Sequence, residues 1–431
     1  GTHEEEHQRL PKKIALPVFA SDAISSTAYA TDEILLVLLS QAAIGAAAWQ
    51  YLSPLAIVVC VLLAIVVTSY RQTIHAYPSS GGSYIVSREN LGTLPSLVAG
   101  ASLLVDYILT VAVSIAAGVL AITSAVPAWS DHRVAICIGM IALMMLANLR
   151  GLKESGAMFA PPTYVYVASL MLLIVVGLYR IFVQDLGPMD VDALVASGEL
   201  SGEALEFSQG ASSLGLLMLL RAFSSGAVAL SGVEAVSNGV PAFRKPESRN
   251  AATTIAIMGA ILGSCFLGVS ILASHIKPYR GELDPTGLAL MARHIYGGTG
   301  VLFWIMQIST FAILILAANT AYADFPRLAS IIGRDGFVPR QFANRGDRLV
   351  FSNGIIFLSL VASVLVVAFD GNVTNLIPLY AVGVFTGFTL SQAGMVQHHR
   401  RLHEDGWRSK LVVNAIGAAT TGTVAAVVVI S

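Results

Sequence analysis

Ala20-Ser21-Asp22-Ala23-Ile24-Ser25-Ser26-Thr27-Ala28-Tyr29 is the stretch that decides the fold. It places hydroxyl groups and a carboxylate inside an otherwise apolar run over 14–40, and such side chains compete for the backbone hydrogen bonds of a helix. The pattern recurs as Ser224-Ser225-Gly226 followed by Ser231-Gly232-Val233-Glu234. Two interrupted spans, each with one acid and each opening a block of five helices, predict an inverted repeat whose substrate lies near the bilayer midplane.

The composition around these stretches is typical of a helical membrane protein with many spans. Of the 431 residues, 55% are apolar and only 12% are charged, and the mean hydropathy is +0.73. These values exclude a soluble enzyme and a disordered scaffold, and a net charge of −1 without a basic tract excludes a nucleic-acid binder. Cys60, Cys137 and Cys265 each lie in an apolar run, which argues against a disulfide framework or a zinc cluster.

Eleven runs are apolar enough to be spanning helices, which need about 20 residues each. They cover roughly 14–40, 52–70, 97–127, 134–148, 158–183, 214–238, 251–275, 300–323, 354–369, 374–397 and 411–430, and the fourth and ninth are short.

The distribution of basic residues tests this count. If the N-terminus is cytoplasmic, most of the 25 Lys and Arg residues fall in cytoplasmic segments. Those in or beside external loops are Arg133, Arg180, Arg221, Lys277, Arg280 and Arg293. The asymmetry follows the positive-inside rule, so it supports both the count and a cytoplasmic N-terminus.

The order of the spans predicts the organisation of the chain. A cytoplasmic segment (1–13) precedes a first repeat of helices 1–5 (14–183), an acidic external loop (184–213) and a second repeat of helices 6–10 (214–397). A cytoplasmic loop and helix 11 follow (398–431). Eleven spans would leave the C-terminus outside, so a twelfth helix is expected to return in the full protein.

Another acid lies in the third span, with polar neighbours on the same face of the helix. Successive helical residues are about 100° apart, which brings Tyr107, Thr110 and Ser114 to the side of Asp106. We expect this face to line a polar cavity.

Each of these polar groups also has a structural explanation. Serine and glycine allow close helix packing in membranes, hydroxyls can bond back to their own helix, and Asp106 could pair with Arg221 or His75 near the span ends. The acids favour a functional explanation, because a charged acid at the bilayer centre costs about 2.5–3.5 kcal/mol even on insertion scales. Asp22 and Glu234 are therefore expected to be functional.

Two further features lie near the same depth. Tyr380 follows Pro378 in the tenth span, where the proline frees a backbone carbonyl, although alone this tyrosine would be assigned to packing. Asp32 and Glu33 lie a turn beyond Tyr29 and form either a second acid site or an external entrance lined with negative charge; we favour the entrance.

The candidate side chains all carry oxygen atoms that can accept hydrogen bonds or bind a cation. They are Asp22, Ser25, Ser26, Tyr29, Asp106, Tyr107, Thr110, Ser114, Ser231, Glu234 and Tyr380. Hard monovalent cations take oxygen ligands, and the set contains no soft ligand and no obvious counter-cation. Because no phosphate-binding loop, nucleophile–base pair or metal-spacing motif occurs, the sequence predicts no enzyme activity, no cofactor and no transition-metal site.

Several motifs resemble signatures of the amino acid–polyamine–organocation (APC) superfamily. They are Pro78-Ser79-Ser80-Gly81-Gly82-Ser83-Tyr84 and Asn148-Leu149-Arg150-Gly151-Leu152-Lys153-Glu154-Ser155-Gly156. The resemblance implies an all-α polytopic membrane protein with the LeuT-like five-plus-five inverted repeat and broken helices 1 and 6. The first-span stretch, with Leu379-Tyr380-Ala381-Val382-Gly383-Val384-Phe385 and Leu390-Ser391-Gln392-Ala393-Gly394, is similar to the KimA-type branch of bacterial high-affinity potassium importers.

This resemblance covers nearly the whole chain and implies which residues bind potassium. The ligand pattern of the branch falls on Asp22, Tyr29, Asp106, Tyr107, Thr110, Ser114, Glu234 and Tyr380, with Ser231 where threonine is usual. Glu234, and after it Asp106, is the candidate for carrying a coupling proton. Asp32-Glu33 after Thr31 departs from the Gly-Pro-Glu-like stretch expected there. The resemblance therefore does not define the details of the outer half of the first helix.

We therefore expect a secondary active transporter that imports potassium with a proton across a bacterial cell membrane, with no nucleic-acid partner. An amino acid or polyamine permease is the alternative within transport, but a break that lacks glycine and carries Asp22 suits a cation better than a carboxylate. A cation channel or non-transporting sensor is the alternative from another class, and the paired breaks argue against a channel. A homodimer and control by a cyclic dinucleotide are expected only with the cytoplasmic domain that relatives carry.

Overall fold

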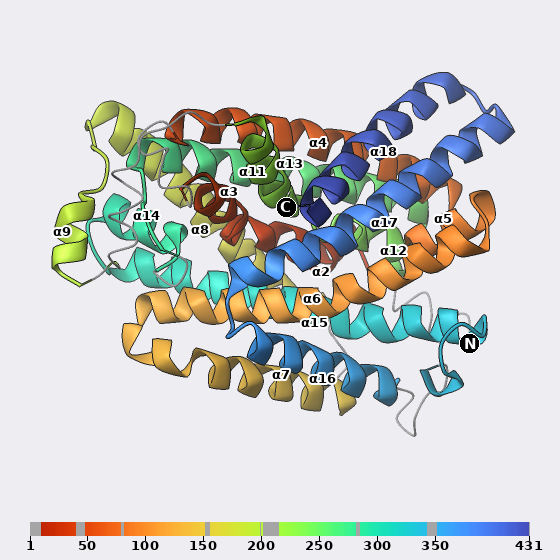
Figure 1. Cartoon of the computed structure of the whole chain (residues 1–431), viewed down its shortest axis with the longest axis horizontal. Helices are drawn as coiled ribbons and strands as arrows, with labels where there is room; N and C mark the ends of the chain where they lie inside the picture. The colour runs from red at the N-terminus through yellow and green to blue at the C-terminus, as the bar shows by residue number, and fades with distance from the viewer. Residues whose placement is uncertain are drawn as a thin grey trace.

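The computed structural model describes residues 10–39, 48–78, 82–150, 156–198, 200, 215–281, 285–342 and 351–430, and this part of the chain is almost entirely helical. The long helices run roughly along the long axis of the molecule (Figure 1). Parts of the acidic loop (201–214) and of the two superfamily motifs (79–81 and 151–155) lie outside the described residues.

The first repeat opens with an interrupted helix. Its elements are α2 (Lys12–Ser25), η1 (Ser26–Ala28), α3 (Ala30–Leu39), α4 (Ala48–Ala76), the short α5 (Gly82–Asn90), α6 (Thr93–Ala125), η3 (Pro127–His132), α7 (Arg133–Leu149) and α8 (Gly156–Val183). The short helix α9 (Val191–Ala196) follows in the external loop predicted from the sequence.

The second repeat also opens with an interrupted helix. Its elements are α11 (Leu216–Gly226), η4 (Ala227–Leu230), α12 (Ala235–Asn238), η5 (Val240–Ala242), α13 (Glu247–Ile276), the short α14 (Gly287–Tyr296), α15 (Val301–Arg334), η6 (Arg340–Phe342), α16 (Ser352–Ala368) and α17 (Val373–Leu402). The helix α18 (Trp407–Ile430) comes after both repeats.

Equivalent elements of the two repeats lie at opposite ends of the bundle. The short helix α5 follows the second long helix of the first repeat, and α14 follows the second long helix of the second repeat. Figure 1 shows α5 at the end that carries the N-terminus and α14 at the other end, beside α9. This arrangement confirms the predicted fold of two inverted five-helix repeats with broken first and sixth helices. The limits of the domains stay a prediction.

All eleven predicted spans correspond to helices. Within the described residues, nine helical segments are long and apolar enough to cross a membrane, and α16 is a shorter apolar helix. The remaining span is the interrupted α2–η1–α3 helix, neither half of which is long enough alone. The exposed apolar side chains on the outside of the bundle, such as Val61, Leu143, Val175 and Val364, face the position of the lipid.

Two span boundaries differ instructively from the sequence prediction. The helix α15 continues to Arg334, well beyond the predicted end at 323, because Asp324 and Arg327 pair with each other and the helix tolerates Pro326. The fourth span is lengthened by η3 to Pro127–Leu149, whereas the ninth remains 17 residues long.

Candidate functional site

The first interruption begins later than the sequence suggests. Helix α2 continues through Asp22 to Ser25, and the backbone then changes to a 3-10 turn. The Ser25, Ser26 and Thr27 hydroxyls donate to carbonyls three residues earlier, at 2.7, 2.6 and 2.7 Å. These bonds satisfy the hydroxyls locally, so Asp22 is left at the buried end of α2 with its carboxylate available to other elements.

The second interruption is in direct contact with the first. The Ser26 hydroxyl also donates to the carbonyl of Ala229 at 2.9 Å, which joins η1 to η4. Gly232 has a φ of +75°, and a Cβ there would lie 2.7 Å from Asp22 Oδ2 and 2.6 Å from the Ala23 nitrogen. Only glycine combines this backbone conformation with such close approach, so Gly232 brings the second break to the Asp22 carboxylate.

Acids from four separate segments of the chain meet beside the two breaks. Asp22, Asp106, Glu234 and Asp324 line one small cavity of about 10 Å³, close to the room that one water molecule needs. The remaining lining residues are Leu103, Tyr107, Gly232, Ala235, Asn238, Val384 and Phe388, so the described lining contains no basic side chain. Asp324 pairs with Arg327 outside this lining, whereas the other three acids have no basic partner in it. Placing several carboxylates together away from water is unfavourable, and a proton or a cation must offset it.

Asp106 is the acid with an unsatisfied oxygen. Its Oδ1 is buried and has no hydrogen-bond partner among the described residues, and the same holds for the Ser231 hydroxyl. The basic partners considered from the sequence, Arg221 and His75, are both exposed. Since nearly all buried polar atoms in proteins are hydrogen-bonded, these two oxygens indicate a place where a ligand completes the site.

The predicted tyrosines and hydroxyls lie together around Ser231. The Thr110 hydroxyl donates to Tyr380 Oη at 3.2 Å. The Ser231 hydroxyl lies beside the phenols of Tyr29 and Tyr380 without completing a hydrogen bond. Ser114 is buried one turn further along α6, at the margin of this group. The predicted polar face of the third span is therefore buried inside the bundle, with Thr110 bonded across to α17 and not back to its own helix.

Glu234 is held by donors from two other helices. Its Oε2 accepts from the Tyr70 hydroxyl of α4 at 3.1 Å, and its Oε1 accepts from the backbone N–H of Ser83 at 2.9 Å. Gly82 makes this possible, because a Cβ there would lie 2.3 Å from Glu234 Oε1. The superfamily motif before the third span thus positions the start of α5 against the acid of the second break.

The position of α5 is fixed by contacts with the end of α15. The Tyr84 hydroxyl donates to Asp335 Oδ2 at 2.6 Å, and Arg88 pairs with the same carboxylate. Burial, together with the hydrogen bond to Asp335, raises the pKa of Tyr84 to about 12, so this phenol remains a protonated donor at neutral pH.

Sequence reasoning missed two residues of the site. Asp324 lines the same small cavity as Asp22 and pairs with Arg327 at 3.2 Å. The Asn238 amide donates to the Tyr107 hydroxyl at 3.0 Å, and its Oδ1 has no partner among the described residues. Asp324 was detectable as a lone acid inside the long apolar helix 301–334, whereas nothing about Asn238 in the sequence distinguishes it from a loop residue.

A wide cavity leads from the acids to the end of the bundle that carries the N-terminus. It measures about 470 Å³ and is lined by Leu10, Phe19, Asn238, Thr320, Asp324 and Arg327 among others. Because Asn238 and Asp324 line both cavities, the acid cluster lies at the bottom of this vestibule. The vestibule opens on the side predicted to be cytoplasmic.

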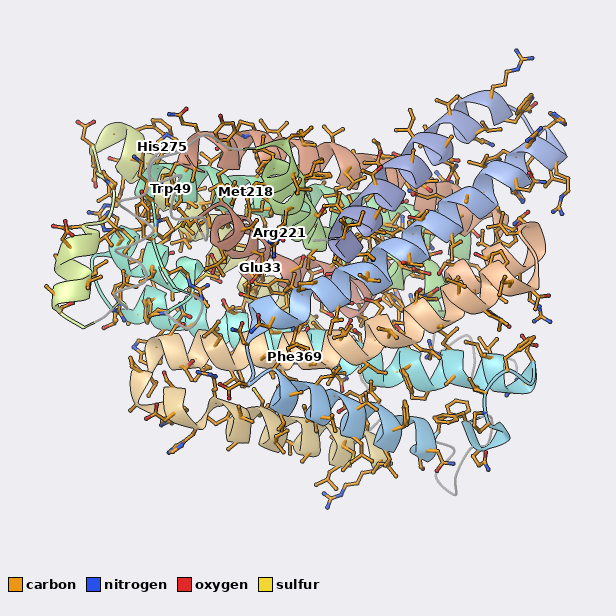
Figure 2. The ribbon with its side chains drawn as sticks, viewed as in Figure 1. Glu33, Trp49, Met218, Arg221, His275 and Phe369 are labelled. Carbon is orange, nitrogen blue, oxygen red and sulfur yellow. The ribbon has the colours of Figure 1, made fainter. Side chains whose placement is uncertain are left out.

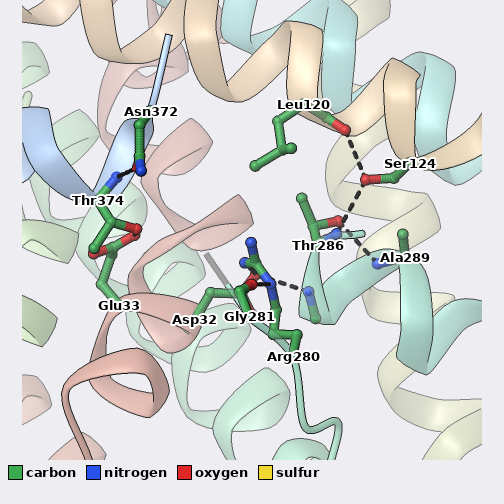
Figure 3. A network of polar contacts seen from close by, with 11 residues as sticks. Asp32, Glu33, Leu120, Ser124, Arg280, Gly281, Thr286, Ala289, Asn372 and Thr374 are labelled. Carbon is green, nitrogen blue, oxygen red and sulfur yellow. Dashed lines mark hydrogen bonds and ion pairs between the residues drawn. The ribbon is translucent and has the colours of Figure 1, made fainter. Parts of the chain in front are cut away.

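The opposite side is closed by polar contacts of Asp32 and Glu33 (Figure 3). Asp32 Oδ2 accepts from Arg280 Nη1 at 3.0 Å and from the Gly287 N–H at 2.8 Å, and both side chains of the ion pair are buried. Glu33 Oε1 accepts from the Thr374 hydroxyl at 3.1 Å. The favoured interpretation of these acids as an open, negatively charged entrance does not describe this structure, because Arg280 neutralises Asp32 and α14 covers it.

The segment that carries Arg280 is anchored in turn. Trp49 Nε1, from the start of α4, donates to the Tyr279 hydroxyl at 2.8 Å. Figure 2 shows Trp49 and His275 toward the end of the bundle that carries α9, and Glu33 deeper inside it. A small cavity of about 20 Å³ lies beside Tyr29, Asp32 and Arg280.

Comparison with known proteins agrees with this architecture. The family described as "Amino acid permease" matches residues 15–431. The chain is also 47% identical over 417 residues to the potassium transporter KimA of Bacillus subtilis (strain 168), an alignment that includes 95% of this chain and 65% of the relative. The chain therefore spans a little less than two thirds of the length of that relative.

Proposed function

Because the chain belongs to the amino acid permease family, we propose that it is a secondary active transporter that imports potassium ions. The membrane is that of a bacterial cell, with the N-terminus on the cytoplasmic side. The identity to a potassium transporter over 95% of the chain supports this substrate.

The observation that carries the proposal is an unsatisfied oxygen in an acid-lined cavity. Asp106 Oδ1 is buried without a partner among the described residues, in a cavity that Asp22 also lines. The Ser231 hydroxyl, also without a partner there, directly precedes Gly232 of the same lining. A dehydrated monovalent cation would use both oxygens as ligands, and it would offset the charge of the surrounding acids. A substrate carboxylate would be repelled by the same acids, which disfavours a permease for neutral amino acids.

Transport by alternating access fits the two ends of the molecule. The vestibule reaches the acids from one side, while Asp32, Arg280 and α14 close the other. A cation channel would need a continuous path, whereas on the outer side Asp32 and Arg280 form a buried ion pair.

The direct test is growth of a potassium-uptake-deficient bacterium at limiting potassium. Cells that express the chain should grow, and cells that express the Asp106→Asn variant should need much more potassium. The matched control is Asp370→Asn, which removes an exposed acid that pairs with Arg133 far from the site. Absence of growth despite confirmed membrane insertion would count against potassium import.

The alternatives are separated in proteoliposomes. A carrier exchanges external labelled rubidium for internal potassium and can concentrate the label even when the membrane potential is held at zero, whereas a channel then lets the label rise only to its external concentration. Uptake of a labelled amino acid or polyamine, without rubidium exchange, would instead support the permease alternative.

Proton coupling is the finer part of the proposal, with Glu234 as the first candidate and Asp106 as the second. Ser83 holds Glu234 Oε1 with an N–H that can only donate, whereas Tyr70 faces Oε2 with a hydroxyl that can donate or accept. Glu234 can therefore take a proton on Oε2 while Tyr70 turns to accept it, and the Tyr70 hydroxyl can then donate to the neighbouring Ser391 hydroxyl.

In proteoliposomes, Glu234→Gln should retain potassium exchange but lose uptake driven by a pH gradient. If exchange disappears as well, Glu234 is primarily a potassium ligand. If uptake driven by the pH gradient persists, the proton travels on another carboxylate, and Asp106→Asn is the next variant to measure.

A further inference from the structure

Two buried histidines lie at the end of α17 that is remote from Tyr380. His398 and His399 are 6% and 2% exposed, and Glu404 follows in the turn before α18. One ligand atom of each of the three residues lies within 4.8 Å of the others, and no other group of three His, Cys, Asp or Glu residues in the described part of the chain meets this condition.

The surrounding amides determine which nitrogen of His399 carries the proton. Asn414 Nδ2 donates to the backbone carbonyl of Lys410 at 2.8 Å, which fixes the orientation of this amide. The same NH₂ group donates to Gln72 Oε1 at 2.7 Å, while Ser69 donates to Asn414 Oδ1 at 2.6 Å. Gln72 therefore presents its oxygen to His399, and His399 Nε2 must be the donor in their 3.1 Å contact. In the neutral ring, Nδ1 is left with a lone pair.

His398 is also held at one nitrogen, but either atom can be the donor in this contact, so its neighbours allow both tautomers. Its Nδ1 lies 2.9 Å from the Tyr77 hydroxyl, which also accepts from Asn90 Nδ2 at 2.7 Å. If His398 Nδ1–H donates to this hydroxyl, His398 Nε2 carries the lone pair. His398 Nε2 and His399 Nδ1 are both buried and have no hydrogen-bond partner among the described residues. Two buried nitrogens without partners, each on a ring held by its opposite nitrogen, are unusual unless something binds between them.

We propose that His398 Nε2, His399 Nδ1 and a carboxylate oxygen of Glu404 bind a divalent transition-metal ion such as Zn²⁺. Imidazole nitrogens with one carboxylate are a common ligand set for zinc, and they disfavour calcium and magnesium, which take oxygen ligands. The contacts of Gln72 and Tyr77 with the opposite nitrogens match the outer hydrogen bonds that orient metal-binding histidines.

This site departs from the sequence prediction of no transition-metal site. Adjacent histidines point about 100° apart on a helix, which is not a recognised metal-binding spacing. The rings converge because their planes are inclined by 80° with centroids 5.3 Å apart, and because the chain turns back at His403 and brings Glu404 toward them. Glu404 is free to move inward, since its carboxylate is about half exposed and its contact with Lys410 is 3.8 Å long.

The test uses the full chain, purified without a histidine tag, treated with a chelator and titrated with Zn²⁺ by calorimetry. We expect one tight equivalent. His398→Gln and His399→Gln should each weaken binding by more than the roughly 10–100-fold that loss of an outer hydrogen bond costs. The matched control is His403→Gln, because His403 is exposed at the same helix end and makes an edge-on ring contact with Trp407 outside the group.

A further variant keeps the test valid if a buried histidine is needed for folding. Glu404→Gln changes an exposed residue, and it should leave thermal unfolding in the absence of metal unchanged while weakening Zn²⁺ binding by about tenfold or more. The proposal is wrong if the unmodified protein binds no Zn²⁺ tightly, if the histidine variants and Glu404→Gln bind it as well as the unmodified protein does, or if His403→Gln loses binding to the same extent.

Discussion

Asp106 and Glu234 are both acids at membrane depth, but their surroundings give them different chemistry. Glu234 accepts a hydroxyl and a backbone N–H, so its negative charge is already stabilised by donors. Asp106 Oδ1 has no donor within the described residues. A carboxylate without donors gains more from a bound cation, so we expect Asp106 to be the more sensitive of the two proposed potassium ligands.

The first prediction concerns the charge of the Asp106 and Asp22 carboxylates. Asp106→Asn and Asp22→Asn keep the shape of the side chain but remove the charge that offsets cation dehydration. Charge-assisted contacts are roughly twice as strong as neutral ones, so the apparent potassium affinity of uptake should fall by about tenfold or more in each variant. Unchanged affinity in both would mean that the cation binds elsewhere, and Asp370→Asn serves as the control at an exposed acid.

Thr110 and Ser114 provide a second prediction on the same helix face. Thr110→Val removes the hydroxyl that donates to Tyr380, and Ser114→Ala removes one a turn further along. Both should weaken potassium affinity with little loss of folded protein, because the neighbouring apolar side chains keep α6 packed. We expect the larger effect at Thr110. Reduced yield with unchanged affinity in the surviving protein would assign these hydroxyls to packing.

At the scale of elements, the two interrupted helices form the acid-lined cavity, and α14 contributes to the closed outer side. The breaks meet through Ser26 and Gly232 and expose Asp22 to the cavity. The short helix α14 begins against the outer half-helix α3, since its first N–H and the neighbouring Arg280 both donate to Asp32. We expect these two contacts to break when the outer side opens.

The third prediction concerns this outer contact. Asp32→Asn removes the negative charge of a buried ion pair with Arg280, and breaking a buried pair typically costs about 3–5 kcal/mol. The thermal unfolding temperature of the purified protein should fall clearly. Removing the exposed Asp370–Arg133 pair with Asp370→Asn should cost only about 0–1 kcal/mol. Equal, small shifts in both variants would show that the Asp32–Arg280 pair does not hold the outer side closed.

For the whole molecule, the structure describes a state that is open toward one end. A cavity of about 470 Å³ extends from the acids to Leu10 and Arg327, whereas the space near Tyr29 on the other side is about 20 Å³. With the N-terminus inside, this is an inward-open arrangement, from which a bound cation would leave to the cytoplasm.

The fourth prediction tests this orientation. In a variant without Cys60, Cys137 and Cys265, Thr320→Cys should react with a membrane-impermeant thiol reagent from the cytoplasmic side, because Thr320 lines the vestibule. Thr310→Cys, which replaces a buried residue of the small outer cavity, should react much more slowly from either side. Labelling of Thr320→Cys from the outside would reverse the proposed orientation.

The sequence alone determined the spans, their order and the acids at membrane depth. A bilayer demands about 20 apolar residues per helix and makes each buried acid expensive, so both features are visible along one chain. Asp22, Asp106 and Glu234 stood out for this reason, as did the paired breaks that predicted the inverted repeat.

Only the tertiary structure decided which hydrogen-bond and ion-pair partners these residues have. Whether Glu234 has donors depends on Tyr70 and Ser83, and whether Asp32 is an open entrance or half of an ion pair depends on Arg280. These partners come from helices far away in the sequence, and no local pattern encodes which side chains meet across a helical bundle. The same reason explains why Asn238 and the lone pairs of His398 and His399 were invisible until the helices were packed together.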